Sequence, residues 1–502
     1  MQYRIRKTKT ASGAIAIQVV RYAKRKLIIV KHIGSSHTDD ELKTLQQIAI
    51  KWIEQITKQK SLFTLPPEHS SDKRLMLLDK CEYLGVRYTF IYEILHQLLA
   101  RFGFTALGSA LINDLVIMRI VEPTSKARSI ELLKECFGIH HRRQAFYEIL
   151  PKMIKLKDKI ERLTVKLAME ELAFDFSLVF YDVTTLYFES FEPDELRKCG
   201  FSKDNKFQQP QIVIGLVVNQ EGFPIAYEIF AGNKFEGHTL IPVIEAFKTK
   251  HQISTLTVVA DAAMISLDNI QMLEKHNLHY IVGARMGNIS LKILKEASQT
   301  LNSQDGATGR IATPCGDLVF GFSLKRYCKD KREMEKQIKR AEEMLQNQTK
   351  RKRIKFLKNS NKTTYELNTE LIEKSKILLG IKGYYTNLEE KTTDNQAIIN
   401  QYHNLWHVEQ AFRIAKNDLE MRPIFHFKEE SIKVHVLICF MALAVSKYME
   451  IKTDASLSQI IKTFKRITDA RLSDNLTKQE VILRTKIPPE AQTLLQQLNL
   501  PY

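Results

Sequence analysis

The sequence predicts an α/β fold in which a mixed sheet of five strands is covered by helices. The first observation is a change of pattern near residue 176, where mostly helical spacing gives way to apolar stretches of strand length. The second is the order that follows, which is three strands, a helix, a strand, a helix and a strand. The third is that two of the apolar runs end at an acid, Asp182 and Asp261.

The strands are expected where short runs are rich in β-branched and aromatic residues. The residues 219–222, Asn-Gln-Glu-Gly, form the turn between the second strand and the third. This order is that of an RNase H-like fold, with Asp182 on the first, central strand and Asp261 at the end of the fourth, its neighbour. In chain order we expect strands at 176–187, 210–218 and 223–231, a helix at 239–250, a strand at 255–261, a helix at 266–276 and a strand at 279–285.

The chain before this sheet is predicted to be mainly helical. Alternating stretches near the start, AIAIQVVRY and KLIIVKHIG, predict a small hairpin or sheet, and the capping residues 38–41 begin a helix at Asp39. Pro66 and Pro67 mark a linker. Residues 75–165 have the apolar spacing of helices, some of them short and basic. These helices either bind DNA or form a helical bundle with a basic face exposed to solvent.

A basic segment interrupts the α/β pattern after the fifth strand. Residues 325–362 carry 15 Lys and Arg against five Asp and Glu, a net charge of +10 out of +18 for the chain. We expect this segment to be helical and to contact phosphates. The alternative is a solvated amphipathic hairpin, which is what most charge runs are. A strand is expected next, at 376–387.

A helix with an unusual polar face follows. Tyr402, Leu405, Glu409 and Lys416 are spaced by 3, 4 and 7 residues, so they are predicted to share one face. The face makes sense if the carboxylate holds a metal ion while Tyr402 and Lys416 bind phosphate oxygens. The alternative is an amphipathic helix with a surface ion pair. The buried side is expected to consist of Trp406, Val408 and Phe412.

Three acids are the strongest functional indication. Asp182 and Asp261 on adjacent strands, with Glu409 on a covering helix, can converge on two Mg²⁺ ions, as in enzymes that transfer phosphoryl groups. A buried carboxylate without a cation is costly, so a repeated acid at the end of an apolar strand needs a reason. The sequence therefore predicts a metal-dependent site that acts on nucleic acid.

Composition agrees with an anionic partner. The 502 residues include 75 Lys and Arg against 57 Asp and Glu, a net charge of +18, and this favours a polyanion such as DNA. A basic but ordinary soluble protein is the alternative from charge alone. The six cysteines form no C-x-x-C pair, so neither a zinc ribbon nor a disulfide framework is indicated, and a reducing cytoplasm fits.

Other classes of protein are not supported. The start, MQYRIRKTKT, has no apolar stretch after it, so it is not a signal peptide. The longest apolar run, 436–445, is shorter than the roughly 20 residues of a membrane span and predicts a buried core helix. There is no Walker A or G-x-G-x-x-G pattern for a nucleotide. His403 and His407 lack the H-E-x-x-H pattern of a zinc site.

Four stretches of the chain resemble DDE transposases of the IS4-type insertion sequences, nearest the IS1634-like group. The Tyr-x2-Arg-x3-Glu-x6-Lys signature of that family falls on Tyr402, Leu405, Glu409 and Lys416, with Leu405 where the family often has Arg. Arg413, one turn further on, can substitute for it. The resemblance covers roughly 170–450, and its matching stretches are YDVTTLYFES, GFSKDNKFQQPQIVIGLVVNQEGFPIAYEIFAGN, VVADAAMIS and YHNLWHVEQAFRIAKNDLEMRPIFH.

The resemblance implies a transposase that binds terminal inverted repeats, cuts the ends and joins them to target DNA. Asp182, Asp261 and Glu409 would be catalytic and would hold two Mg²⁺ ions, which Mn²⁺ can replace. The expected partners are double-stranded DNA and a second copy of the chain in a synaptic dimer, with no membrane, in the cytoplasm at the nucleoid. The expected DNA contacts are Tyr402, Arg413, Lys416, Lys350, Arg351, Lys352 and Arg353.

Two further points separate this chain from its relatives and from rival functions. The insertion before the Glu is usually β-rich in the family, whereas a helical middle is expected here. The insertion also has no Trp, since Trp52 and Trp406 are the two in the chain. The alternatives are a catalytically inactive, transposase-derived DNA-binding protein and an RNase H-like nuclease.

These patterns divide the chain into six regions. The middle four comprise a helical, DNA-binding region, the two parts of the RNase H-like core, and the basic insertion subdomain between those parts. A small α+β region precedes them, and a helical region that could serve dimerisation follows. In chain order the ranges are 1–65, 66–165, 166–290, 291–380, 381–450 and 451–502.

Overall fold

The structure is a computed structural model of the 502 residues. It describes the chain except for residues 1–2, 24–25, 58–80, 190–191, 203–205, 265, 348–353, 362–363, 476–478 and 502. The linker predicted at Pro66 and Pro67 and the basic residues Lys350, Arg351, Lys352 and Arg353 lie outside the described residues.

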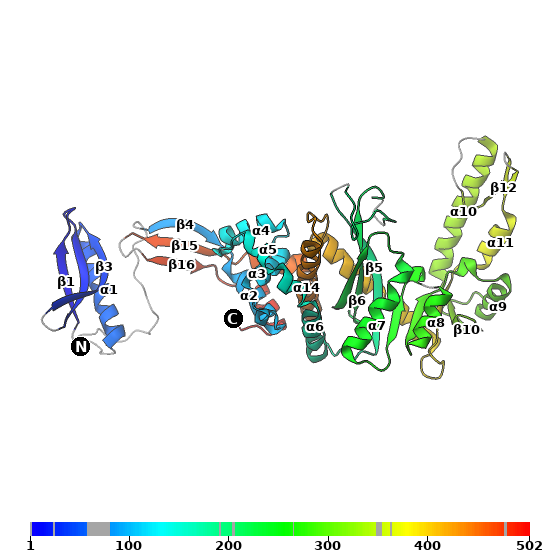
Figure 1. The fold of residues 1–502 in the computed structure, drawn as a ribbon, viewed down its shortest axis with the longest axis horizontal. Helices are drawn as coiled ribbons and strands as arrows, with labels where there is room; N and C mark the ends of the chain where they lie inside the picture. Colours follow the sequence, from blue (N-terminus) through cyan, green and yellow to red (C-terminus); the bar gives the residue numbers. More distant parts are fainter. Residues whose placement is uncertain are drawn as a thin grey trace.

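A mixed sheet of eight strands lies at the centre of the fold (Figure 1). The strands β5, β8 and β9 run parallel to one another, and the other neighbours pair antiparallel. Across the sheet the strands are β10 (Thr308–Thr313), β11 (Gly316–Phe322), β14 (Ile381–Thr386), β9 (His279–Gly283), β8 (Thr257–Ala260), β5 (Leu178–Tyr187), β6 (Gln211–Val218) and β7 (Pro224–Ala231).

The five strands predicted between 176 and 285 are all present, in the predicted order. Two helices make the crossovers that parallel strands need, α7 (Leu240–His251) between β7 and β8, and α8 (Leu267–Lys275) between β8 and β9. The prediction of a five-stranded sheet is wrong, because β14 pairs with the edge strand β9 and carries β11 and β10 with it. The chain 291–380 therefore contributes to the sheet as well as to a subdomain.

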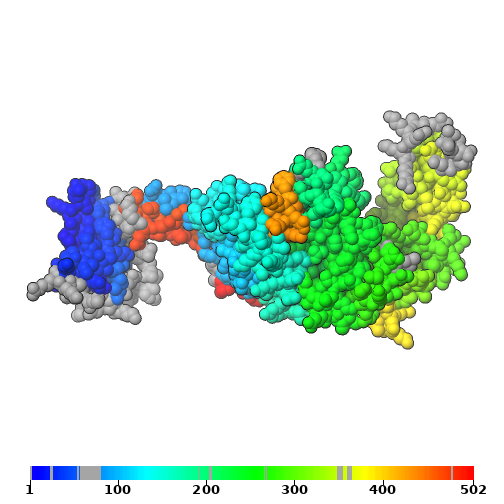
Figure 2. All heavy atoms as spheres, in the orientation of Figure 1, coloured from blue at the N-terminus to red at the C-terminus, as the bar shows by residue number. Residues whose placement is uncertain are grey.

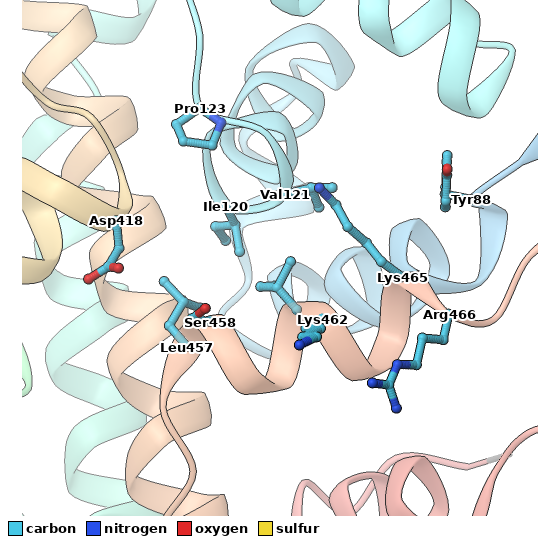
Figure 3. Close-up of a pocket in the computed structure, with 11 residues that line it drawn as sticks. Tyr88, Ile120, Val121, Pro123, Asp418, Leu457, Ser458, Lys462, Lys465 and Arg466 are labelled. Atoms are coloured by element: carbon cyan, nitrogen blue, oxygen red, sulfur yellow. The ribbon is translucent and has the colours of Figure 1, made fainter.

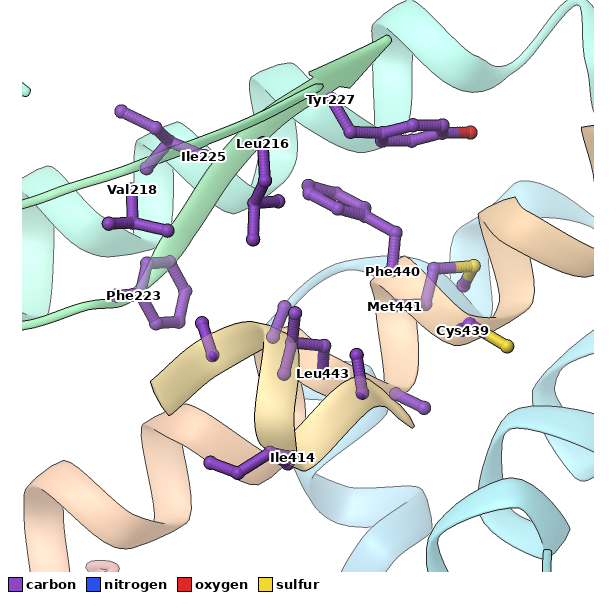
Figure 4. Close-up of a cluster of buried hydrophobic side chains, with 14 of the residues drawn as sticks. Leu216, Val218, Phe223, Ile225, Tyr227, Ile414, Cys439, Phe440, Met441 and Leu443 are labelled. Carbon is purple, nitrogen blue, oxygen red and sulfur yellow. The ribbon is translucent and has the colours of Figure 1, made fainter. Parts of the chain in front are cut away.

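The sheet is held by apolar side chains on both faces. Every residue of β6 is buried, which explains why its sequence is a continuous apolar run. On one face the strands β6 and β7 pack against the helix α14 (Glu429–Thr453) and the segment before it (Figure 4). Full burial of a large apolar side chain stabilises by about 1.5–3 kcal/mol. The labelled members of this cluster are Leu216, Val218, Phe223, Ile225, Tyr227, Ile414, Cys439, Phe440, Met441 and Leu443.

The helix α14 is the one described helix that is long and apolar enough to cross a membrane. Its most apolar stretch is 89% buried inside the protein, however. The prediction of a buried core helix at 436–445 is therefore confirmed.

The region before the sheet is helical, as expected, with one exception. The strand β4 (Cys81–Arg87) pairs with β15 (Asp469–Asp474), which also pairs with β16 (Glu480–Arg484). The expectation that the last 50 residues are helical is therefore only partly right. The helices of the two regions are α2 (Thr89–Arg101), α3 (Ala110–Val121), α4 (Lys126–Leu132), α5 (Gln144–Ile154), α6 (Lys157–Glu171), α15 (Leu457–Lys465) and α16 (Pro489–Gln497).

The start of the chain forms the predicted small sheet. Its three antiparallel strands are followed by a helix that begins at Asp39, as the capping residues indicated. Isoleucine, valine and leucine side chains from the sheet and the helix form a separate small core. The elements are β1 (Tyr3–Lys9), β2 (Ile15–Ala23), β3 (Lys26–Ser36) and α1 (Asp39–Thr57).

The insertion has a helical middle, as its sequence predicted. The helix α10 (Leu324–Asn347) contains eight of the 15 cations of the basic segment 325–362, and β12 (Leu357–Asn361) and β13 (Thr364–Leu367) form a hairpin after it. The expectation that the basic segment is helical is therefore only partly right. The strand predicted at 376–387 begins later, because α11 (Thr369–Ile377) occupies the first part. The helix α9 (Leu291–Leu301) lies between β9 and β10. The division of the chain into six domains stays a prediction.

Candidate active site

Asp182 and Asp261 lie side by side on the central strands. Tyr181 of β5 is paired in parallel register with Ala260, the last residue of β8. Asp182 is the next residue of β5, and Asp261 directly follows β8. Neighbouring strands are about 4.8 Å apart, so the register places the two acids on adjacent backbones. Asp182 is half-buried and Asp261 is exposed. The sequence prediction of neighbouring acids is confirmed.

Tyr402 connects to this pair through Asp261. Its hydroxyl donates to Oδ1 of Asp261 at 3.2 Å, and the backbone amide of Ala262 donates to the same oxygen at 2.7 Å. Gly283, at the end of β9, leaves room for the phenol, because a Cβ there would lie 2.5 Å from the hydroxyl oxygen. Burial and the charge of Asp261 raise the pKa of Tyr402, so it remains a hydrogen-bond donor at neutral pH. In this structure Tyr402 orients an acid.

The helix expected to carry four site residues on one face is broken. It consists of α12 (Asn395–His403), α13 (Trp406–Arg413) and a π-helical turn, η7 (Ile414–Asp418). At the break, the amide of Leu405 donates to the carbonyl of Tyr402, three residues back. The helix α12 lies over β8, β9 and β11, whereas α13 packs against β5 and β6. The pair of helices therefore crosses the sheet above both aspartates.

The break changes which side chains are buried. Tyr402 and Leu405 are buried and Glu409 is exposed. Burial and the charge of Asp261 raise the pKa of Tyr402, and the charge of Glu409 adds to this, so Tyr402 and Glu409 lie within electrostatic reach of one another. The shared polar face stays a prediction. Val408 and Phe412 are buried as expected. Trp406 is not, since 51% of it is exposed and its ring stacks on His407 at 3.9 Å. A turn at Asn404 and Leu405 separates the residues of α12 from those of α13.

The cations near Glu409 differ in their surroundings. Arg413, expected to take the place of the family's Arg, is exposed, and Lys416 is half-buried within η7. Leu405 is buried against the core, so the position where the family often has Arg faces the protein interior here. A cation close to Asp261 therefore comes from another element.

Lys382 of β14 is such a cation, and sequence reasoning missed it. Its ammonium lies over the ring of Tyr402 at 4.7 Å and over that of Tyr384 at 5.4 Å. Burial and the nearby Arg326 lower the pKa of Lys382, while the charges of Asp261 and Glu409 act in the opposite direction. The ammonium is thus within electrostatic reach of two of the three acids. No periodicity in the sequence marks it, because its position depends on the pairing of β14 with β9.

The basic helix α10 begins beside this site. The charge of Arg326 affects the pKa values of Lys382, Tyr384 and His403, which places the first turn of α10 close to α12 and β14. The side chains that give the helix its charge are all exposed, which suits contact with a polyanion. They are Lys325, Arg326, Lys329, Lys331, Arg332, Lys336, Lys339 and Arg340.

The three acids are residues of the type that binds a hard divalent cation. Carboxylate oxygens are preferred ligands of Mg²⁺ and Mn²⁺, and two of them are supplied by adjacent strands. Among the described residues, however, no group of three His, Cys, Asp or Glu side chains is compact enough to hold a metal ion. The protein therefore provides carboxylate ligands, two of them at the same edge of the sheet. Glu409 does not complete a compact cluster with them in this structure.

A cavity of about 440 Å³ lies elsewhere, between α3, η7 and α15 (Figure 3). Lys462, Lys465 and Arg466 are on its wall, together with Asp418, whose pKa is raised by burial and by Glu450. The cavity contains none of the three predicted acids. It is therefore separate from the candidate active site.

Comparison with known proteins identifies the family. The chain resembles a piggyBac transposase in a synaptic complex with hairpin DNA, with a TM-score of 0.39 and 10% identity over 75% of this chain and 76% of that one. It also resembles the Mos1 transposase in a paired-end complex, with a TM-score of 0.16 and 15% identity over 47% of this chain and 66% of that one. No curated protein matches the chain.

Both TM-scores are low, so the assignment depends on the match of a domain family. The transposase DDE domain matches residues 174–445, more than half of the chain, and this range includes the two aspartates, Lys382 and Glu409. The chain therefore belongs to the transposase DDE domain family.

Proposed function

We propose that this protein is a DNA transposase of the IS4 type, in the IS1634-like group, with an RNase H-like core. It binds the terminal inverted repeats of an insertion sequence, cuts the DNA at those ends and joins them to target DNA. The observation that carries the proposal is the parallel register that sets Asp182 beside Asp261, inside the region that matches the DDE domain.

Asp182, Asp261 and Glu409 are the proposed catalytic and metal-binding residues. When bound, two Mg²⁺ ions, or Mn²⁺, supply the positive charge that activates the attacking oxygen and stabilises the leaving oxygen. The chain's own part is to hold Asp182 and Asp261 side by side at one sheet edge, with Glu409 supplied by the covering helix α13. Tyr402 fixes the orientation of Asp261 through its hydrogen bond, so the carboxylate does not have to reorganise during the reaction.

The reaction proposed is in-line displacement at phosphorus, first by water and then by the freed 3′-hydroxyl. Most of such catalysis is positioning of the strand and stabilisation of charge. Lys382 over Tyr402, with Arg413 and Lys416 further along, provides cations on both sides of Glu409 that can bind backbone phosphates. The exposed lysines and arginines of α10, and Lys350, Arg351, Lys352 and Arg353 after it, extend the proposed DNA contacts.

The partners proposed are double-stranded DNA, as inverted repeats and as target, and a second copy of the chain. Two transposon ends must be held together for joining, which is the reason for a dimer. The protein would act in the cytoplasm, on the nucleoid. The net charge of +18 supports a polyanionic partner, since each phosphate contact releases counterions.

The test is cleavage of a labelled inverted-repeat end with Mg²⁺ by wild type and by Asp182→Ala, Asp261→Ala and Glu409→Ala. We expect wild type to nick and join the end, and each variant to bind the end without cutting it. If wild type binds the end but never cuts it, with Mg²⁺ or Mn²⁺, the protein is a non-catalytic DNA-binding relative. If it cuts DNA but never joins a 3′-hydroxyl end to a target, it is a nuclease.

A further inference from the structure

Exposed aromatic rings gather on two loops that no predicted site residue occupies. The loop between β5 and β6 presents Phe201 and Phe207, which are 72% and 51% exposed, with ring centroids 6.3 Å apart. The segment 422–428 before α14 presents Phe425 and Phe427, each 61% exposed. We call these four rings and the cations between them the aromatic surface. Exposed apolar groups that cluster in this way mark a binding surface.

The backbone at Phe201 is fixed by buried contacts. The side-chain amide of Gln211 donates to the carbonyl of Phe201 at 2.8 Å and to that of Gly232 at 3.0 Å. Gly200 lies so close to Gly232 that a Cβ would be 2.3 Å from its carbonyl oxygen. Phe201 is therefore exposed at a backbone position that buried contacts fix.

Phe427 is held in place by a different set of contacts. The guanidinium of Arg197 lies between the rings of Phe188 and Phe427, 5.6 Å from each, and Asp194 accepts a hydrogen bond from it at 2.7 Å. A bridge between Phe188 and Ile424 ties the segment 422–428 to the end of β5. The two loops therefore form one surface, although more than 200 residues separate them in the sequence.

Cations are interleaved with these rings. Lys206, next to Phe207, lies over the ring of Tyr187 at 5.3 Å, and Arg422 lies over the same ring at 5.8 Å. Two acids of the first loop are paired, Asp194 with Arg197 and Glu195 with Lys198, and Glu189 and Glu192 are exposed. The surface thus combines flat apolar faces with positive charge, and this pairing suits bases together with phosphates.

The aromatic surface lies on the same edge of the sheet as the acids. The strand β5 runs parallel to β8, so the carboxyl ends of the two strands point to the same edge of the sheet. Asp261 follows β8 on that side, and both loops are attached to β5 at its carboxyl end, beyond Tyr187. In Figure 2 the orange segment that includes residues 422–428 lies at the surface beside the green residues before β6. A DNA strand that enters the candidate active site could therefore continue onto this surface.

We propose that the aromatic surface binds unpaired bases of a DNA strand, which stack on Phe201, Phe207 and Phe427 while Lys206 and Arg422 bind the adjoining phosphates. Paired bases hide their faces in the duplex, so the surface selects single-stranded DNA. An apolar protein partner would leave the interleaved cations unused. The inference deepens the proposed function, on which it rests, by naming the form of DNA held next to the three acids.

The test measures the fluorescence anisotropy of a labelled oligothymidylate of about 16 nucleotides and of a duplex of equal length with the full-length protein. Phe201→Ala and Phe427→Ala should each weaken binding of the single strand by about 5- to 100-fold, with duplex binding unchanged. Phe201→Tyr keeps a ring and should restore single-strand affinity. Tyr83→Ala, which removes an equally exposed aromatic ring on β4, is the matched control and should have no effect.

The outcomes separate this inference from the proposed function. If the alanine variants bind oligothymidylate as wild type does, and wild type cuts its labelled ends, the aromatic surface has another occupant and the transposase stands. If wild type binds neither form of DNA, the proposed function itself fails. A change in oligomeric state by Phe427→Ala, with single-strand affinity unchanged, would assign the surface to a second copy of the chain.

Discussion

The hydroxyl of Tyr402 donates to Oδ1 of Asp261 at 3.2 Å, and this bond joins α12 to the end of β8. One aspartate of the candidate active site is thereby oriented by α12, the helix that directly precedes α13 with Glu409. The bond depends on Gly283, which leaves space for the phenol. Positioning of a metal ligand by a neighbouring donor is as much part of a metal site as the ligand itself.

Tyr402→Phe should therefore weaken metal use while the fold survives. The substitution removes a hydroxyl and keeps the ring that packs on Tyr384 and beneath Lys382. We expect the Mg²⁺ concentration for half-maximal cleavage to rise by about 10- to 100-fold. Tyr384→Phe, which removes a hydroxyl that contacts His403 at 3.3 Å, is the matched control. Equal Mg²⁺ requirements in the two variants would show that the bond to Asp261 does not position a ligand.

Lys382→Met should reduce cleavage and binding of the DNA end together. The variant keeps most of the apolar stem over the two rings and loses the charge. Loss of a hydrogen bond between charged groups costs about 1.5–3 kcal/mol, so the rate of cleavage should fall by roughly 10- to 100-fold. Lys382→Arg should retain most activity. If Lys376→Met, a change at an exposed lysine of α11, had the same effect, Lys382 would have no special position.

The exposed cations of α10 should determine the salt dependence of DNA binding. Lys325, Lys329, Arg332 and Lys336 lie within three turns of the helix, and their replacement by Gln should lower the slope of log K against log salt by about 0.9 for each lost phosphate contact. Replacement of the three lysines by Arg keeps the charge and should preserve the slope. A slope that stays constant in the Gln variant would remove α10 from the DNA interface.

Lys126 makes the stability of the protein depend on pH. It is buried, contacts Nδ1 of His435 at 2.7 Å, and lies near Arg119 and Cys439. Burial, with a smaller contribution from Arg119, lowers the pKa of Lys126 to about 7 from 10.5. Between these values the unfolded chain holds the proton and the folded chain does not, so stability rises with pH by about 1.4 kcal/mol per unit.

Lys126→Met should abolish this part of the pH dependence. The variant should be stabilised most relative to wild type at pH about 7, and its advantage should shrink toward pH 10.5. The measurement is the midpoint of denaturant unfolding for both proteins across this window. His435→Gln changes the contact and leaves the buried lysine, so it serves as a control. If the unfolding midpoints of wild type and Lys126→Met changed in parallel with pH, Lys126 would not titrate in this window.

Much of the central sheet could be predicted because its strands are continuous apolar runs. The buried strand β6 and the Asn219–Gly222 turn after it are of this kind, and their order placed Asp182 next to Asp261. The pairing of β4 with β15 could not be predicted in this way. Those strands join distant parts of the chain and have several exposed side chains, Tyr83 among them, so no alternation identifies a buried face.

The candidate site was predictable where it depends on strand register, and less so where it depends on helix geometry. The spacing of Tyr402, Leu405 and Glu409 suggests one face only if the helix is continuous, and the turn at Asn404 breaks it. Lys382 was missed because it is brought to the site by strand pairing across the sheet. The burial pattern of a strand can be read from its own residues. The contact between β14 and α12, by contrast, depends on how the whole chain folds.

The most direct test of the central claim is the amount of joined product formed from a labelled transposon end and a target DNA. Asp182→Asn keeps the shape of the side chain and removes its charge, and Asp268→Asn makes the same change at an exposed acid in the first turn of α8. We predict no joined product from Asp182→Asn, a normal amount from Asp268→Asn, and binding of the end by both. Joined product from Asp182→Asn at the wild-type level would contradict the three-acid site.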